Sequence, residues 1–222
     1  MADAAQRMEG SPSTADDDPT NDRIISLSDG IFAFAMTLMV LQFDLPSPDT
    51  VAAGELRRDI LDQWPALFSY AVSYFVIANY WIVHHRMFRL IRTHDAWLMW
   101  INVAFLFSIS FLPFPTDVMG EYRDQPFAIV FYALAMAATS LLSTVEWWYV
   151  SNRRRLLVSG VTRELARYHL LRGICVMTVF LVSAVLARID TTLAQFSWLA
   201  LFPVLFALSR VYRDALTDSS SA

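Results

Sequence analysis

A carboxylate stands inside a segment that is otherwise apolar enough to cross a membrane. The segment spans residues 23–45, RIISLSDGIFAFAMTLMVLQFDL, and its acid is Asp29, with Ser26 and Ser28 beside it. A membrane helix needs about 20 apolar residues at about 1.5 Å each. Burying a charge among them is costly, so an ionisable residue there indicates a functional or structural polar site. The alternative from this segment alone is a position near the headgroups, where Asp29 only accepts local hydrogen bonds.

Two adjacent histidines lie near the end of a second apolar segment. The sequence SYFVIANYWIVHHRMFRLIR places Trp81, His84 and His85 within two helical turns. Neighbouring residues on a helix point about 100° apart, so the two histidines are not expected to bind one metal ion. Asp29 is the only other obvious candidate ligand, so a metal site is disfavoured. We expect one histidine to hydrogen-bond a neighbouring helix and the other to meet the interface. Asn102, in a third apolar segment, is expected to link helices.

The first segment also carries a stripe of large apolar side chains. Phe34, Leu38, Leu41 and Leu45 follow at steps of four, three and four, with Thr37 beside them. This spacing places them on one face of a helix. The segment has no glycine between residues 31 and 53, and the chain has no TVGYG-like filter sequence. We expect a continuous helix whose side chains, not backbone carbonyls, face any ion. From spacing alone the stripe either packs against helices and lipid or lines a pathway.

Composition identifies the chain as a membrane protein. Of its 222 residues 56 % are hydrophobic and 17 % charged, with a mean hydropathy of +0.41, whereas a soluble domain carries about 25 % charged residues. The apolar residues form long blocks, which predicts six membrane helices. The predicted spans are 24–45, 65–89, 96–115, 126–150, 170–188 and 193–212. We therefore expect an all-α polytopic protein with one membrane domain at 23–213.

Polar tails flank that domain. Residues 1–22 hold six acids against the single basic residue Arg7, and such a segment buries too little apolar surface to fold, so a disordered acidic tail is predicted. It also lacks the basic and apolar regions of a cleavable signal peptide. Residues 214–222, DALTDSSSA, form a second short polar tail.

Arginine placement predicts the orientation. All 17 basic residues are arginine, and with the N-terminus inside only four of them lie in outer loops: Arg57, Arg58, Arg123 and Arg188. An excess of basic residues marks the cytoplasmic side, so both termini are expected in the cytoplasm. The run Arg153–Arg155 follows two tryptophans at a span end, which is typical of an interface anchor and not of nucleic-acid binding. The sole cysteine, Cys175, excludes an intrachain disulfide.

Three motifs in order resemble one known family. R-x-x-x-[F/L]-S-D-G opens the first span, W-x-x-H-H-x-x-F closes the second, and F-L-P-F-P-T closes the third. In this order they resemble transmembrane protein 175, the endosomal and lysosomal potassium channel family, in its bacterial form with six helices per subunit. The resemblance is close over the first three spans. It covers the last three mainly in hydropathy and length.

The resemblance implies a homotetramer in which the first helix of each subunit surrounds a leak-like pathway for potassium ions. Its selectivity over sodium would be modest, because a narrow apolar ring only partly dehydrates the ion. By motif position, the constriction falls on Phe34, Leu38 and Leu41, and the polar layer on Thr37. The supporting polar network comprises Arg23, Ser28, Asp29, Trp81, His84, His85 and Asn102. The partners implied are potassium ions, the lipid bilayer and further copies of the chain. No cofactor, metal, nucleic acid or enzymatic activity is implied.

Two positions depart from the family pattern. Leu27 stands where the family usually has Phe before Ser-Asp-Gly, and Phe34 stands at a constriction position that is usually aliphatic. Four phenyl rings around an axis either occlude it or rotate aside. Two other functions stay open: a proton-linked transporter or proton pathway that relays through Asp29 and a histidine, and an intramembrane metal hydrolase that uses Asp29, His84 and His85. Against the transporter, the chain shows no inverted repeat and no helix broken at midspan.

Overall fold

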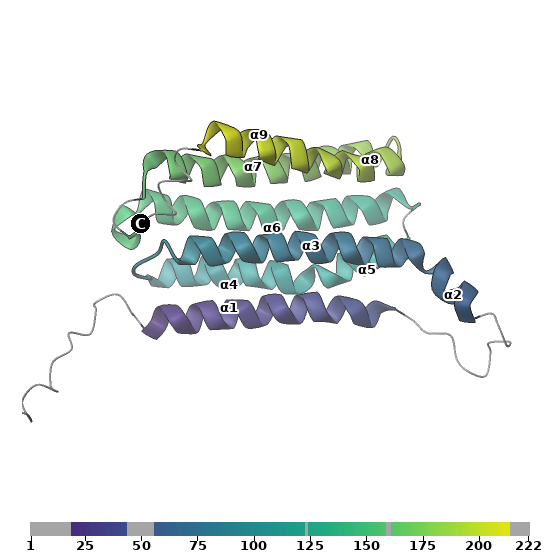
Figure 1. Cartoon of the computed structure of the whole chain (residues 1–222), viewed down its shortest axis with the longest axis horizontal. Coiled ribbons are helices and arrows are strands. Elements are labelled where there is room, and N and C mark those ends of the chain that lie inside the picture. Colours follow the sequence, from purple (N-terminus) through teal and green to yellow (C-terminus); the bar gives the residue numbers. More distant parts are fainter. Residues whose placement is uncertain (1–18, 44–55, 123, 159–160, 214–222) are drawn as a thin grey trace, which may run out of the picture.

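The protein, seen in a computed structural model, is a bundle of helices that lie side by side (Figure 1). The structure describes residues 19–43, 56–122, 124–158 and 161–213. Of the predicted tails at 1–22 and 214–222, residues 1–18 and 214–222 lie outside the described residues, as does Leu45. Residues 19–22 were predicted to be disordered, but they form the first turn of α1. In chain order the helices and turns are α1 (Pro19–Leu38), η1 (Met39–Gln42), α2 (Leu56–Asp62), α3 (Trp64–Phe88), α4 (Ala96–Phe111), α5 (Pro113–Glu121), α6 (Pro126–Asn152), η2 (Arg154–Leu156), α7 (Arg163–Leu186), α8 (Thr191–Ser197), η3 (Trp198–Ala200) and α9 (Leu201–Val211).

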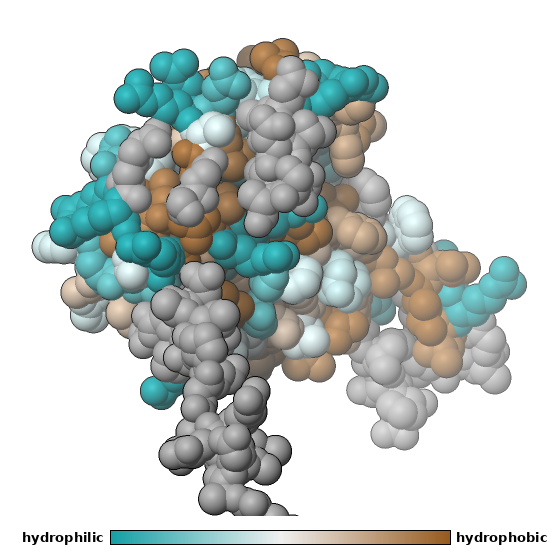
Figure 2. Space-filling view, turned by 60° about the vertical axis from the view of Figure 1, so that its left-hand side comes forward, coloured by the Kyte–Doolittle hydropathy of each residue, from teal (hydrophilic) through white to brown (hydrophobic). Residues whose placement is uncertain are grey.

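The bundle has two distinct edges and two distinct ends. Helix α1 lies at one edge and α7 to α9 at the opposite edge, with α3 to α6 between them (Figure 1). The start of α1, the α3–α4 and α6–α7 connections and the end of α9 lie at one end. We call it the arginine end, after Arg86, Arg89, Arg92, Arg153, Arg155, Arg163 and Arg167. Figure 2 brings this end forward and shows its hydrophilic residues with apolar ones between them.

Each of the six predicted spans contains a helix, and five of these helices are long and apolar enough to cross a membrane. The five are Arg23–Leu41, Ala96–Glu121, Pro126–Asn152, Arg163–Leu186 and Thr191–Val211. Helix α3 does not reach this hydropathy over its described residues, because Asn79, His84, His85 and Arg86 lie in its second half. The chain is therefore an all-α, multi-pass membrane protein with five spans established by length and composition.

The third span continues beyond the prolines that were predicted to end it. Helix α4 ends at Phe111, and α5 begins at Pro113 and runs on to Glu121. Pro113 has no N–H to donate back into α4, but the first turn of a helix needs no such bond, so a new helix starts there. The Thr116 side chain donates to the Leu112 carbonyl at 2.9 Å, which satisfies an acceptor at the junction.

The fifth span begins seven residues earlier than the sequence predicted. Helix α7 starts at Arg163 and passes Arg172 and Gly173 without a break. Its start is fixed by Thr162, whose hydroxyl accepts a hydrogen bond from the Leu165 N–H at 3.1 Å, an N-cap that satisfies one of the unpaired donors of the first turn. The prediction of a start at 170 was wrong because this cap was not recognised.

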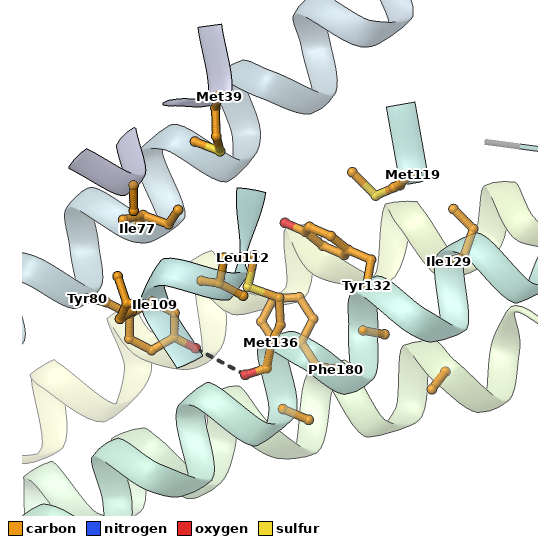
Figure 3. Close-up of a cluster of buried hydrophobic side chains, with 14 of the residues drawn as sticks. Met39, Ile77, Tyr80, Ile109, Leu112, Met119, Ile129, Tyr132, Met136 and Phe180 are labelled. Atoms are coloured by element: carbon orange, nitrogen blue, oxygen red, sulfur yellow. Dashed lines mark hydrogen bonds between the residues drawn. The ribbon is translucent and has the colours of Figure 1, made fainter. Parts of the chain in front are cut away.

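One buried cluster joins the layers of the bundle. Its side chains come from α1, α3, α4, α5, α6 and α7, and Figure 3 labels Met39, Ile77, Tyr80, Ile109, Leu112, Met119, Ile129, Tyr132, Met136 and Phe180. The Tyr80 hydroxyl donates to the Met136 carbonyl at 3.3 Å (Figure 3) and also pairs with Ser140. A hydroxyl in an apolar interior needs such partners, so these bonds fix how α3 packs on α6.

Helices α6 and α7 approach each other closely at Gly173. A Cβ atom at Gly173 would overlap the Thr144 hydroxyl and lie 3.2 Å from the Thr144 Cβ. The absence of a side chain at residue 173 therefore permits this contact, as small residues commonly do between membrane helices.

Gly173→Ala is expected to lower the melting temperature of the detergent-solubilised protein, because the added methyl overpacks the α6–α7 contact by about 1–3 kcal/mol. Fluorescence-detected size exclusion after heating measures this. The matched control is Gly120→Ala, whose added Cβ meets no atom closer than 3.7 Å. Equal melting temperatures for the two variants would show that the α6–α7 approach is not tight.

Candidate functional site

Helix α1 has one buried and one uncovered face. Its buried side chains, Ile24, Ser28, Phe32, Ala35 and Met39, follow at helical spacing and face the bundle. The opposite face is exposed and carries large apolar side chains. No helix in the part of the chain that the structure describes covers this surface, so either lipid or another protein chain covers it.

The predicted constriction residues lie on this uncovered face. Phe34 is 60 % exposed and Leu41 75 % exposed, Thr37 is exposed, and Leu38 is half-buried. The sequence predicted a continuous helix in this span. The structure differs, because the α-helix tightens into the 3₁₀ turn η1 after Leu38. In such a turn residues three apart lie above one another, so Leu41 stays in line with Leu38.

Thr37 adds a polar group to the same face. Its hydroxyl donates to the carbonyls of Ala33 and Phe34, both at 3.0 Å. A hydroxyl has one proton and two lone pairs. Since the proton is used within the helix, the oxygen presents lone pairs to the exposed side, where they can accept a hydrogen bond or coordinate a cation.

Asp29 binds α1 to α3. The Trp81 indole N–H donates to the Asp29 Oδ1 at 2.7 Å, the short distance of a hydrogen bond to a charged acceptor. Asp29 is half-buried. These two members of the predicted polar network thus make a direct contact between the first and second predicted spans.

His84 binds α3 to α4. It is buried, and its Nε2 lies 2.9 Å from the Asn102 Oδ1; an amide oxygen only accepts, so His84 Nε2 donates. The imidazole stacks between the rings of Phe88, at 4.3 Å, and Phe105, at 5.3 Å. This aromatic packing holds the imidazole in one orientation, so the His84–Asn102 hydrogen bond links α3 to α4 in a fixed geometry.

The other residues of the predicted network do not join these two pairs. Ser28 donates to the Ile24 carbonyl of its own helix at 2.8 Å, and Arg23 is exposed. The His85 ring lies 5.8 Å from the Trp81 ring, and its buried Nδ1 has no hydrogen-bond partner among the described residues. The structure therefore shows two separate polar pairs, with His84 as the histidine that links helices.

The residues proposed for a metal hydrolase are not arranged as ligands. Asp29 accepts from Trp81, and His84 is paired with Asn102. Within the described ranges, no three His, Cys, Asp or Glu side chains gather so that they could hold a metal ion. A protein zinc site takes three or four such ligands, so the geometry does not support this alternative.

Sequence reasoning missed an anchor at the arginine end. Asp95 caps α4 by accepting from the Leu98 N–H at 3.0 Å, and the Tyr149 hydroxyl donates to both of its oxygens at 2.9 Å. Arg153 lies 3.4 Å and Arg155 3.9 Å from Oδ2. Burial alone raises the pKa of Asp95, but these bonds and arginines outweigh it and lower the pKa below its usual value. The sequence did contain a signal for this cap, because Asp95 directly precedes the predicted third span.

A second missed group is Glu146 in α6. It is fully buried, and neither carboxylate oxygen has a hydrogen-bond partner in the part of the chain that the structure describes. A buried charge without a partner is costly, so this side chain is stable there in its protonated, neutral form. The signal was present in the sequence as an acid inside the predicted span 126–150.

Comparisons with known proteins agree on one family. Residues 23–113 match the family model described as endosomal/lysosomal potassium channel TMEM175. A potassium channel of Streptomyces collinus is 33 % identical over 149 residues, which are 65 % of this chain and 71 % of that protein. A potassium channel of Chamaesiphon minutus is 34 % identical over 146 residues, 64 % of this chain and 71 % of that protein.

More distant relatives and solved structures extend the comparison. The human endosomal/lysosomal proton channel TMEM175 is 23 % identical over 147 residues, 65 % of this chain and 29 % of that protein. The crystal structure of a lysosomal potassium-selective channel TMEM175 homolog from Chamaesiphon minutus covers 87 % of this chain and 98 % of its own, with a TM-score of 0.72 and 24 % identity. The potassium channel MtTMEM175 gives a TM-score of 0.64 at 18 % identity, over 86 % of this chain and 93 % of that one. These two structures support the same fold.

Trp81→Phe is expected to destabilise the protein by about 1–3 kcal/mol, because it leaves Asp29 without its donor. Asp29→Asn keeps an acceptor oxygen for the indole and is expected to cost less. The melting temperature of purified protein measures both. Trp148→Phe is the matched control, since Trp148 is exposed on α6. Altered ion selectivity in a Trp81→Phe protein of unchanged stability would place Asp29 in the ion path and contradict a structural role.

Proposed function

Because the chain belongs to the TMEM175 family of endosomal/lysosomal potassium channels, we propose that it is one subunit of a homotetrameric potassium channel. Ions pass along an axis surrounded by the uncovered face of α1 from each subunit. The observation that carries this proposal is the two-sidedness of α1, which is packed into the bundle on one face and presents Phe34, Thr37 and Leu41 on the other. We take potassium as the permeant ion because two relatives of this chain are named potassium channels.

Six passes, including α3, fit this architecture. Helix α3 has 25 residues, about 37 Å at 1.5 Å per residue, which is enough to cross the hydrocarbon core. It lies among the other helices in Figure 1, and its polar residues Tyr80 and His84 are paired with neighbouring helices. Satisfied in this way, polar groups are tolerated inside a membrane bundle. An even number of passes places both termini on the arginine side, which we assign to the cytoplasm.

Selectivity in this channel comes from side chains. The carbonyls of α1 are engaged in the helix, so they are not available as a filter. Four copies of Phe34 and Leu41 make apolar rings that an ion passes only after losing part of its hydration shell, and such rings block conduction when they dewet. Four Thr37 oxygens between these rings supply partial replacement for the lost water. Potassium sheds water more readily than sodium, which gives a modest preference.

A proton pathway is the second candidate function, since vertebrate relatives are named proton channels. A relay through Asp29 and a histidine would need the two groups to be connected. Instead, Asp29 accepts from Trp81, and His84 donates to Asn102. The described geometry therefore favours a structural role for these groups, and the flux experiment below separates the two functions.

Purified protein in liposomes is expected to pass potassium down its gradient without any proton gradient. Leu41→Ala and Phe34→Ala are expected to raise this flux several-fold and to lower the preference over sodium, because a wider apolar ring admits water. Efflux into potassium-free buffer, followed with a potassium-sensitive dye, measures the rates.

The control variant is Phe202→Ala, which removes an equally exposed side chain from α9 at the opposite edge of the bundle. It is expected to conduct like the wild type. Potassium movement that stops when the proton gradient is collapsed would overturn the channel and favour the proton-linked alternative. Unchanged flux in a stable Leu41→Ala protein would remove that side chain from the constriction.

A further inference from the structure

A small cavity opens on the side of the bundle away from the uncovered face of α1. It lies between α3, α6 and α7 and has a volume of about 40 Å³, which is room for about two or three water molecules. The polar side chains that line it are Asn79, Tyr80, Ser140, Ser143, Thr144, His169 and Arg172. Membrane helices otherwise pack with apolar and small residues, so this group of polar side chains requires an explanation.

The cavity is positively charged. The Arg172 guanidinium donates to the Asn79 Oδ1 at 2.8 Å, and Tyr168, one turn earlier on α7, also hydrogen-bonds it. A guanidinium has five N–H donors, so further donors are free for another acceptor. Arg86 on α3 acts electrostatically on both Arg172 and His169. The two arginines repel each other unless an anion lies between them.

Among the described residues no acidic side chain forms an ion pair with Arg86 or Arg172; the arginines paired with Asp95 are Arg153 and Arg155. Arg172 lies nine residues inside α7, which begins at Arg163, or about 14 Å from the helix start. An arginine without a counter-charge at this depth is costly, so a negatively charged ligand would stabilise the site.

The surface beside the cavity is apolar. Arg172 and Asn79 join α7 to α3, and the α3 surface one turn on either side of Asn79 carries the exposed apolar side chains Phe75 and Ile82. Such a surface suits acyl chains. Arg86 is close to the arginine end, where headgroups lie, whereas Arg172 is deeper, so basic groups line a path from the headgroup region to the cavity.

We propose that this cavity binds the phosphate group of an anionic phospholipid, with Arg86 and Arg172 as the charged contacts and Asn79 and His169 as further donors or orienting groups. The phosphate oxygens enter the cavity with water, and the acyl chains lie along α3. The site prefers phosphatidylglycerol to zwitterionic phosphatidylcholine, because each arginine near an anionic headgroup contributes affinity worth about fivefold. The proposal is independent of conduction.

Native mass spectrometry of the protein in detergent doped with either lipid tests this site. The wild type is expected to retain phosphatidylglycerol in preference to phosphatidylcholine, and Arg172→Gln to reduce retention of phosphatidylglycerol about fivefold. Arg86→Gln, at an exposed position on α3, is expected to act in the same direction and carries the test if Arg172→Gln does not fold. Equal retention of the two lipids by the wild type would overturn the proposal.

Arg210→Gln is the matched control, because it removes the same charge on α9, where Arg210 lies over the Phe206 ring. It is expected to retain phosphatidylglycerol like the wild type, and a loss equal to that of Arg172→Gln would reduce the effect to general surface charge and overturn the site. Inorganic phosphate distinguishes the source of the anion. A thermal shift with phosphate as large as that with phosphatidylglycerol would assign the cavity to a free anion and contradict a lipid.

Discussion

The hydrogen bond from the Trp81 indole to Asp29 fixes the rotation of α1, and the rest of the molecule is arranged around that rotation. A helix can turn about its own axis within apolar surroundings at little cost, but a carboxylate with one strong donor has one favourable direction. With Asp29 held by Trp81 at 2.7 Å, Phe32 and Met39 point into the bundle, and Phe34 and Leu41 point out of it. The polar pair therefore decides which side chains are presented to the outside.

The neighbouring contacts extend this control from α1 to the other layers. The pair of His84 and Asn102 joins α3 to α4, and Tyr80 with Ser140 joins α3 to α6. In a bilayer the apolar residues have nearly the same environment inside and outside the bundle, so packing and hydrogen bonds between helices carry more of the specificity than in water. Helix α3, which contributes Trp81, His84 and Tyr80 to these bonds, is thus the element that holds the others in register.

The family and the paired residues could be predicted because they depend on local motifs. The family resemblance placed Trp81 and Asp29 in one polar network, and the structure shows a direct hydrogen bond between them. The prediction that the chain is a membrane protein and not an enzyme is also confirmed, since it belongs to a channel family. The sequence did not decide which of His84 and His85 links helices. The two side chains point about 100° apart on one helix, and tertiary packing sets which of them faces the neighbouring helix.

Other features depended on contacts that no local pattern contains. The prolines at 113 and 115 predict a helix end, yet α5 restarts at once because a proline is favourable in a first helical turn. Glu146 was passed over as part of an apolar block, and only its complete burial shows that it differs from an interfacial acid. The cavity around Arg172 forms only where α3, α6 and α7 meet. It can therefore be recognised from the folded structure but not from the sequence.

Cysteine cross-linking tests most directly whether copies of α1 face one another. The chain has a single cysteine, Cys175, so a Cys175→Ser protein gives a clean background for Leu41→Cys. A disulfide needs two Cα atoms within about 7 Å, which symmetric copies of α1 around a narrow axis provide. Mild oxidation is expected to give covalently linked subunits with Leu41→Cys but only monomers with Phe202→Cys on α9. Monomers from both variants would contradict an axis lined by α1.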